Sequence, residues 1–325
     1  MSDKNVMFVF PGQGSQYRGM GSDIYAAFPV ARDVYGAASE ALGYDVVKLS
    51  FEDPNDEIGL TRFTQPALLT HSIACLRVFE ELTDSVVKPG CAAGHSLGEY
   101  TALVMAGSLT LEAGLKLVQK RGELMGAHGE GGMMALTMDV DAARAVADKH
   151  YCQVASCNLP TQTVVGGRES DLESLAKDIA ENYPGKRAIP LATEGAFHTY
   201  FMITAAQLFR DVLDDVSFAV PSTTVLANYT AGVYETDPEC FRTHLFFQLF
   251  NPVNWVGCLH TAIELGVDRF VEFGGGLGAG EDPSGKRPNL ESIIRRTLKS
   301  RNHAAEYIAA INCESIESAA KQFVN

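Results

Sequence analysis

The chain has 325 residues, of which 46% are hydrophobic and 20% charged, as expected for a soluble globular protein with one large domain and room for a smaller insertion. Its formal net charge of −14 argues against nucleic acid or an anionic membrane as a general partner. The seven cysteines are scattered without a C-x-x-C pair and H-E-x-x-H is absent, so no metal site is predicted. Because the N-terminus also lacks a signal-peptide pattern, a cytoplasmic protein with reduced thiols is expected.

The first half of the chain alternates strands, loops and helices. Residues 6–10 predict a short buried strand, and the loop at 11–16 leaves its carboxyl end. Helical patterns dominate to about residue 85, a helix follows from 97 to about 106, and Thr110 is the expected N-cap of another that ends near 126. This alternation predicts an α/β domain with a mainly parallel sheet, whose ligands bind at the carboxyl ends of the strands.

A serine bracketed by glycines lies between a short apolar run at 91–93 and the helix that starts at 97. The pattern is G-x-S-x-G, with Gly94, Ser96 and Gly98 at the fixed positions. A strand, a tight turn and a helix with serine at the apex form a nucleophile elbow, in which a Cβ on either flank would collide with neighbouring backbone. The alternative is a glycine-bounded loop without catalytic meaning.

The middle of the chain has a different pattern. Strands are predicted at 133–138, 152–157, 163–166 and 187–191, with helices at 139–149 and 169–183. The order β-α-β-β-α-β is that of a ferredoxin-like unit. Long helices return afterwards, with two more strands at 224–227 and 269–273. We therefore expect an α/β protein: a large α/β-hydrolase-like domain with a parallel sheet (1–128 and 197–325), interrupted by an inserted ferredoxin-like subdomain (129–196), with a cleft between them.

A catalytic serine needs a base, and His198 is the strongest candidate among the eight histidines. It lies where the two domains rejoin, among small residues that let a substrate or another backbone approach closely. A base within hydrogen-bond reach would take the serine proton and later return it. The alternative is a structural loop histidine. No acidic residue is obvious as its orienting partner, although an ordinary hydrolase triad would supply one.

Arg121 falls on the apolar stripe of the helix at 110–126, although the other charged residues of this helix lie on its polar face. An arginine that faces inward must be paired, because an isolated buried charge costs several kcal/mol. Its planar fork suits a carboxylate held by two hydrogen bonds. A structural salt bridge to Asp or Glu, or a stem that extends along the edge of the stripe to solvent, are the alternatives.

These residues are parts of a larger set of motifs in a fixed order, and through them the chain resembles the malonyl-CoA:acyl-carrier-protein transacylases. The resemblance runs from about residue 6 to 273 and includes both the fatty-acid enzyme and the stand-alone acyltransferases of trans-acyltransferase polyketide synthesis. The motifs that carry it are FPGQGSQ at 10–16, TQPAL at 64–68, GHSLGE at 94–99, Arg121-Gly122 with Met125, Asn158 with Pro160 and Gln162, AFH at 196–198 and QLFNPV at 248–253.

The resemblance implies a catalytic group on matching positions. Ser96 would be the nucleophile and His198 the base, oriented by the backbone carbonyl of Gln248, which would account for the missing acid. Backbone N–H groups of Gln13 and Leu97 would form the oxyanion hole, where fixed donors stabilise charge that develops in the transition state.

The resemblance also implies the substrate. Arg121 would hold the malonyl carboxylate, Gln65 would help to shape the pocket, and Phe197 before His198 resembles the malonyl type rather than the serine-containing methylmalonyl type. Malonyl-CoA would be the substrate and an acyl carrier protein, or a carrier domain of a polyketide synthase, the partner, in a ping-pong reaction through a malonyl-serine ester with no bound cofactor. The alternatives are an editing acyl hydrolase, a transferase of a larger acyl group between carrier proteins, and a non-catalytic interaction domain.

The C-terminal part departs from the family pattern. A glycine-rich stretch at 274–280 leads into an extra polar loop to residue 288, for which a mobile loop is expected rather than a nucleotide site. Positive charge is concentrated after it, either as a docking patch for an acidic carrier protein or as a solvated helix with cations near its carboxyl end. The basic residues are Lys286, Arg287, Arg295, Arg296, Lys299 and Arg301.

Overall fold

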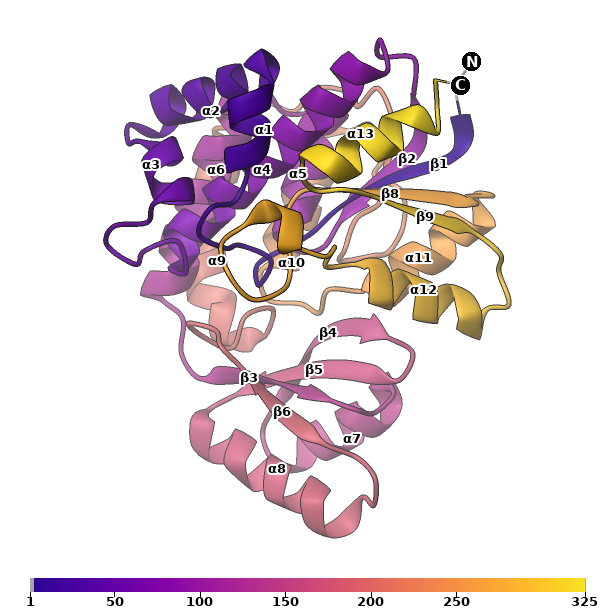
Figure 1. The fold of residues 1–325 in the computed structure, drawn as a ribbon. Helices are drawn as coiled ribbons and strands as arrows, with labels where there is room; N and C mark the ends of the chain where they lie inside the picture. The colour runs from indigo at the N-terminus through magenta and orange to yellow at the C-terminus, as the bar shows by residue number, and fades with distance from the viewer. Residues whose placement is uncertain (1–2, 325) are drawn as a thin grey trace.

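The computed structural model describes residues 3–324, and it contains one parallel and one antiparallel sheet (Figure 1). The parallel sheet has the order β7-β2-β1-β8-β9, so the strand that carries the elbow lies beside the first strand of the chain. Its strands are β1 (Asp3–Phe10), β2 (Pro89–Gly94), β7 (Thr224–Val225), β8 (Arg269–Phe273) and β9 (Glu306–Ala310). The predicted fold class is confirmed.

Both faces of this sheet are buried under helices. Successive side chains of a strand point to opposite faces, so neighbouring residues enter different cores. Phe8 and Phe10 of β1 join the core on one side, and Met7 and Val9 join the core on the other. The first side is covered chiefly by α1 (Ser22–Ala27), α2 (Pro29–Leu42), α3 (Val46–Phe51), α4 (Thr61–Leu82), α5 (Leu97–Met105), α6 (Leu111–Ala127), α9 (Ile203–Asp214), α10 (Pro238–Gln248) and α13 (Cys313–Lys321). The second side is covered by α11 (Trp255–Glu264) and α12 (Glu291–Ser300).

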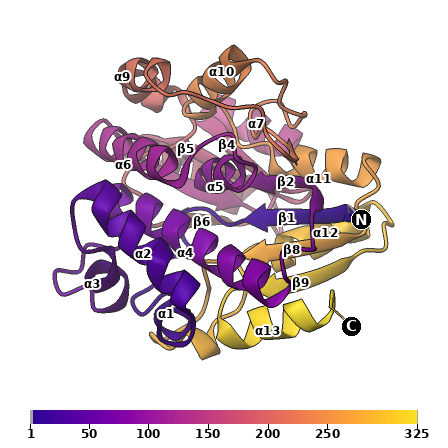
Figure 2. The same cartoon turned by 90° about the horizontal axis from the view of Figure 1, so that it is seen from above.

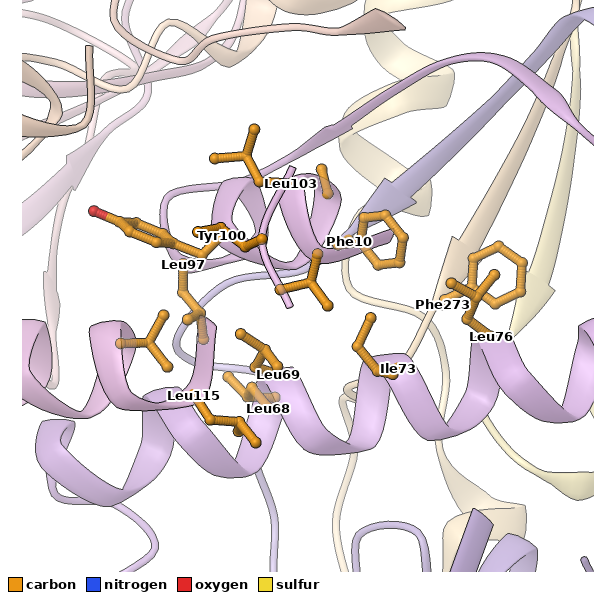
Figure 3. Close-up of a cluster of buried hydrophobic side chains, with 14 of the residues drawn as sticks. Phe10, Leu68, Leu69, Ile73, Leu76, Leu97, Tyr100, Leu103, Leu115 and Phe273 are labelled. Atoms are coloured by element: carbon orange, nitrogen blue, oxygen red, sulfur yellow. The ribbon is translucent and has the colours of Figure 1, made fainter. Parts of the chain in front are cut away.

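The long helix α4 is buried along most of its length and fixes the position of α5. Leu68, Leu69 and Ile73 of α4 point toward Leu97 and the rest of α5 in the close-up of the core (Figure 3). Burial of such side chains stabilises the fold by about 1.5–3 kcal/mol each. The helix that follows the elbow is therefore held by a rigid apolar layer.

The antiparallel sheet belongs to a smaller unit with its own core, and its helices lie on the side away from the parallel sheet (Figure 1). Its strand order is β4-β5-β3-β6, and the elements follow the predicted β-α-β-β-α-β succession. They are β3 (Gly132–Leu136), α7 (Val140–Lys149), β4 (Gln153–Leu159), β5 (Gln162–Gly167), α8 (Glu169–Asn182) and β6 (Ala188–Leu191). The domain limits at 129–196 stay a prediction, supported by a core cluster drawn only from residues between 134 and 188.

The edge of the small sheet is bonded to the large unit. Val253 donates its N–H to the carbonyl of Ala155 at 3.0 Å, and Cys157 donates to the carbonyl of Val253 at 2.9 Å. Both partners of Val253 lie on β4, and Val253 itself lies five residues after Gln248. The small unit is therefore attached to the segment that follows α10 as well as through its two chain connections.

The C-terminal part differs from the sequence prediction in two ways. The sequence predicts two strands after the small unit, but β9 and the helix α13 follow as well, with α13 packed beside α4 (Figure 2). The loop expected to be mobile contains the short 3₁₀ helix η2 (Pro283–Gly285) and is fastened by Lys286, whose ammonium donates to the carbonyls of Gly278 and Gly280 at 2.8 and 2.6 Å. No described helix is long and apolar enough to cross a membrane.

Candidate active site

The turn between β2 and α5 requires both of its glycines. A Cβ on Gly94 would lie 1.9 Å from the carbonyl carbon of Gly98, and a Cβ on Gly98 would lie 2.2 Å from the carbonyl oxygen of Phe10. Ser96 stands between them with φ of 51° and ψ of −101°, a positive-φ conformation that is uncommon for a residue with a side chain. Such strain is tolerated where the surrounding structure fixes it, and it concentrates at functional sites.

The side chain of Ser96 is hydrogen-bonded to His198. Oγ of Ser96 lies 2.8 Å from Nε2 of His198, and Nδ1 of His198 lies 2.7 Å from the main-chain oxygen of Gln248. A carbonyl oxygen only accepts, so Nδ1 carries the proton and Nε2 presents a lone pair to the serine hydroxyl. Burial and the neighbouring Arg121 charge lower the pKa of His198 to about 3, so this imidazole is neutral at pH 7.

Arg121 reaches the same serine from α6. Its Nη2 donates to Oγ of Ser96 at 3.1 Å and to Oε1 of Gln248 at 3.0 Å, and the guanidinium lies over the ring of Tyr100 with its carbon 5.2 Å from the centroid. The residue is 1% exposed, so the stem does not extend to solvent.

The guanidinium has no anionic partner in direct contact. Arg121 is in none of the ion pairs between described residues, and its Nε lacks a hydrogen-bond partner. Burial lowers the pKa of Arg121 from its usual high value, but a guanidinium keeps its proton at neutral pH. The structural salt bridge considered for this arginine is therefore not formed, and no carboxylate of the described residues contacts the guanidinium charge.

A cavity of about 370 Å³ lies between the two units, with Ser96, Arg121 and His198 in its wall. Phe197 lines it beside the histidine, and Met133 contributes from the small unit. Gln65 does not line this cavity. It is buried behind Met125, a lining residue, with its Nε2 3.5 Å from the sulfur.

Two main-chain segments line the cavity beside Ser96. Leu97 is the first residue of α5, so its N–H has no partner within the helix. Gln13 lies on the loop after β1, which packs so closely on the elbow that a Cβ on Gly12 would lie 2.4 Å from the carbonyl oxygen of His95. The Gln13 side chain donates to Oγ1 of Thr61 at 3.1 Å, and both Gln13 and Leu97 line the cavity.

Sequence reasoning missed a second set of polar residues behind the serine. Oδ1 of Asn228 accepts from the N–H of Ser96 at 2.7 Å, and its Nδ2 donates to the carbonyl of Gly94 at 2.8 Å. The fully buried Glu99 accepts from the N–H of Asn228 at 3.2 Å and from the hydroxyl of Tyr234. An acid inside the otherwise apolar stretch at 97–105 was the available signal for this group.

His95 and Asn158 join the two units at the other wall of the cavity. Nε2 of His95 donates to Oδ1 of Asn158 at 2.7 Å, and both residues line the cavity together with Ser156. Burial lowers the pKa of His95, so it is a neutral donor here. Both residues belong to the motif set recognised in the sequence, but their contact was not predicted there.

The proposed basic patch needs a correction. Lys286 is only 8% exposed because it lies over the Tyr17 ring and binds two carbonyl oxygens. Arg295 is paired with Glu291 at 2.8 Å, one turn earlier on α12. Arg296 and Lys299 are exposed on the same helix. The patch therefore loses Lys286 but keeps its other members, and a docking role for it stays a prediction. The exposed members are Arg287, Arg295, Arg296, Lys299 and Arg301.

The comparisons with known proteins agree with one another. A family model described as an acyl transferase domain matches residues 7–274. The chain is similar to the malonyl CoA-acyl carrier protein transacylase of Bacillus subtilis (37% identity over 323 residues, 97% of this chain and 96% of that protein). It is also similar to the polyketide biosynthesis malonyl CoA-acyl carrier protein transacylase PksC of B. subtilis (35% over 275 residues, 83% and 93%).

The chain is also similar to solved structures of malonyl-CoA:acyl carrier protein transacylases. The crystal structure of the malonyl-CoA:acyl carrier protein transacylase of Xanthomonas oryzae superposes with a TM-score of 0.89 at 30% sequence identity, and the match covers 100% of both chains. A match of this extent includes both sheets, so the two-unit architecture is shared as a whole.

Proposed function

The chain belongs to the malonyl-CoA:acyl-carrier-protein transacylase family, and we propose that it moves a malonyl group from coenzyme A to the phosphopantetheine thiol of an acyl carrier protein. The observation that carries the proposal is the buried guanidinium of Arg121, 3.1 Å from the hydroxyl of Ser96. An acyl group esterified to that serine and ending in a carboxylate would meet a preorganised cationic fork. A bidentate arginine–carboxylate pair in a buried site is both strong and directional.

The first half-reaction transfers malonyl to the serine. His198 accepts the proton of Ser96 at Nε2 as Oγ attacks the thioester carbonyl. The main-chain N–H groups of Gln13 and Leu97 stabilise the negative charge that forms on the carbonyl oxygen. The C–S bond then breaks, and the coenzyme A sulfur leaves with the proton from His198, which leaves malonyl-Ser96 and a neutral imidazole.

The second half-reaction reverses these steps with another thiol. The phosphopantetheine thiol of the carrier protein gives its proton to His198 and attacks the ester carbonyl. Collapse of the intermediate forms the malonyl thioester of the carrier and returns the proton to Ser96. The cavity of about 370 Å³ between the two units limits the water that reaches the ester between the two halves.

The orientation of His198 favours transfer over the editing hydrolase. Its Nδ1 partner is the neutral carbonyl of Gln248 at 2.7 Å, where a hydrolase triad has a carboxylate. The arginine also opposes the editing hydrolase and the transferase of a larger acyl group, since an acyl group without a carboxylate would leave the buried Arg121 charge without an anion.

The test is steady-state transfer from malonyl-CoA to a holo acyl carrier protein. Initial rates measured at several concentrations of both substrates should give parallel double-reciprocal lines, as a ping-pong reaction requires. Release of free malonate at the same rate without carrier protein would show a hydrolase instead, and intersecting lines would exclude the acyl-enzyme intermediate.

A further inference from the structure

The side-chain amide of Gln248 lies between a buried anion and a buried cation. Its Nε2 donates to Oε2 of Glu99 at 2.6 Å, and its Oε1 accepts from Nη2 of Arg121 at 3.0 Å. Glu99 is 0% exposed, Arg121 and Gln248 are 1% exposed, and the three belong to the different helices α5, α6 and α10. The carboxylate and the guanidinium are therefore linked through one amide without touching each other.

Glu99 acts together with Arg121 and the Ser96 carbonyl to determine which way that amide faces. A carboxylate only accepts hydrogen bonds, and a guanidinium only donates them. With the amide reversed, its oxygen would face the Glu99 carboxylate and its NH₂ group would face the Arg121 guanidinium, so both contacts would become repulsive. The second Nε2 hydrogen is also used, since Nε2 lies 3.0 Å from the carbonyl oxygen of Ser96. Every donor and acceptor of the amide is thereby fixed.

The same glutamine serves the histidine through its main chain. The carbonyl oxygen of Gln248 holds Nδ1 of His198 at 2.7 Å, and Nε2 of that ring meets the serine. Gln248 is the last residue of α10, so its carbonyl has no partner within the helix and its position depends on the anchored side chain.

We propose that Glu99 is a positioning residue that, through the amide of Gln248, holds the Arg121 guanidinium and the His198 imidazole in register with Ser96. The consequence for the substrate rests on the proposed function: Glu99 supports the preference for acyl groups that carry a carboxylate. It acts without contact with the reacting atoms, because Gln248 lies between it and the arginine.

The remaining contacts of the carboxylate extend the same role. Oε1 accepts from the hydroxyl of Tyr234, and Oε2 accepts from the N–H of Asn228, whose side chain binds the N–H of Ser96 at 2.7 Å. Burial, partly opposed by these hydrogen bonds, raises the pKa of Glu99 to about 7. The carboxyl group therefore titrates near neutral pH, whereas its acceptor contact with Gln248 is available in both states.

Two substitutions separate hydrogen bonding from charge. Glu99→Gln keeps an oxygen toward Gln248 and Asn228, and its new NH₂ can donate to the Tyr234 hydroxyl, which is also an acceptor. Glu99→Ala removes the acceptor, so one Nε2 hydrogen of Gln248 loses its partner and only the Arg121 and Ser96 contacts still hold the amide. We expect Glu99→Gln to retain activity within about threefold and Glu99→Ala to lose about a hundredfold in kcat/KM for malonyl-CoA, the cost of misplacing catalytic groups by about 1 Å.

Glu272 is a matched control. It is also 0% exposed, accepts from a tyrosine hydroxyl (Tyr307) and two main-chain N–H groups, and has a pKa raised to about 7 by burial. Its contacts stabilise the start of α12 and include no residue of the cavity wall. Glu272→Ala should lose stability as Glu99→Ala does while the ratio of malonyl to acetyl acylation stays unchanged.

The experiment measures acylation of Ser96 by malonyl-CoA and by acetyl-CoA in the wild type, Glu99→Ala, Glu99→Gln, Arg121→Ala and the Glu99→Ala/Arg121→Ala double variant. Glu99→Ala should lower the malonyl-to-acetyl ratio about tenfold, and in the Arg121→Ala background it should lower that ratio no further, because the coupled residue is already gone. A ratio unchanged in Glu99→Ala, or an equal loss in both backgrounds, overturns the proposal.

A second measurement keeps this test apart from the proposed function. A fluorophosphonate ester phosphonylates an activated serine and releases fluoride, without any need for malonyl recognition. Its rate with Ser96 should fall about tenfold or more in Glu99→Ala and be restored in Glu99→Gln, because His198 is affected through Gln248. If the wild type reacts with this probe but not with malonyl-CoA, the proposed function is overturned and the positioning role of Glu99 is not. An unchanged probe rate in Glu99→Ala removes the positioning role whatever the substrate.

Discussion

The main-chain oxygen of Gln248 lies 2.7 Å from Nδ1 of His198, at the place where a serine hydrolase has a carboxylate. A neutral oxygen fixes the tautomer of the ring but adds no negative charge to stabilise the imidazolium that forms during attack. The Arg121 charge on the other side disfavours the protonated ring further. The base is therefore held neutral and oriented, and its protonated state is short-lived.

The rate of Ser96 acylation should change little between pH 8 and pH 5. A base must be neutral to accept the serine proton, and the pKa of His198 is lowered to about 3, mainly by burial. Single-turnover acylation at saturating malonyl-CoA should therefore stay level from pH 8 to 5, whereas a histidine with an ordinary pKa near 6.5 would lose about 30-fold. The Glu99→Gln variant provides the control, since it has no titrating group at that position. A fall with a midpoint near pH 6.5 in both proteins contradicts the neutral, buried base.

Removal of the arginine should reverse the acyl preference. Arg121→Ala removes two charge-assisted hydrogen bonds to a malonyl carboxylate, worth about 1.5–3 kcal/mol each, so kcat/KM for malonyl-CoA should fall at least a hundredfold. Acetyl-CoA has no carboxylate and should lose far less. Arg121→Lys keeps the charge without the planar fork and should be intermediate. Parallel losses for both substrates would mean that the arginine only maintains the site.

The elbow should not accept a methyl group at Gly98. The new Cβ would lie 2.2 Å from the carbonyl oxygen of Phe10, so Gly98→Ala should cost more than about 3 kcal/mol or prevent folding. Gly36 is the control, because it lies inside α2 and a Cβ there would meet open space: Gly36→Ala should stabilise by about 0.5–1 kcal/mol. Chemical denaturation of both variants checks this, and a Gly98→Ala protein as stable as the wild type would refute the tight turn.

The buried carboxyl of Glu272 should make stability depend on pH. Burial raises its pKa from 4.5 to about 7, so the folded state holds this proton more tightly than the unfolded chain does. The contribution of this carboxyl to the free energy of unfolding is fully present below pH 4.5 and is lost as the pH rises through 7. The free energy of unfolding of the wild type relative to Glu272→Gln should therefore fall by about 2–3 kcal/mol between pH 5 and 8. A constant difference across this range would contradict the shifted pKa.

The sequence was sufficient for the elements that rest on local patterns. The β-α-β-β-α-β succession follows from alternating apolar residues and helix signals, and Thr110 caps α6 by accepting from the N–H of Ala113. The strand β9 was missed because its five residues include alanines and a charged start that do not separate a strand from a loop. Its pairing with β8 across the sheet is a tertiary contact that no local pattern contains.

The site, too, has residues that local sequence patterns reveal and contacts that they do not reveal. Arg121 could be recognised from one sequence because a cation on an apolar stripe is a local anomaly. The partnership of Glu99 with Gln248 joins residues 149 positions apart, and that of Ser96 with Asn228 joins residues 132 apart. Such contacts depend on how α5, α10 and the segment after β7 pack. The family resemblance places Gln65 at the pocket; its amide contacts Met125, a residue of the cavity wall, and its part in shaping the pocket stays a prediction.

The most direct test is the intact mass of the protein after brief mixing with malonyl-CoA in the absence of carrier protein. The account predicts that one malonyl group is added to the wild type, that none is added to Ser96→Ala, and that holo acyl carrier protein then removes it and gains the same mass. Acetyl-CoA should give a much smaller adduct, and Arg121→Ala should abolish the difference between the two donors. An adduct that persists in Ser96→Ala, or equal labelling of the wild type by both donors, would contradict the transfer of malonyl through Ser96.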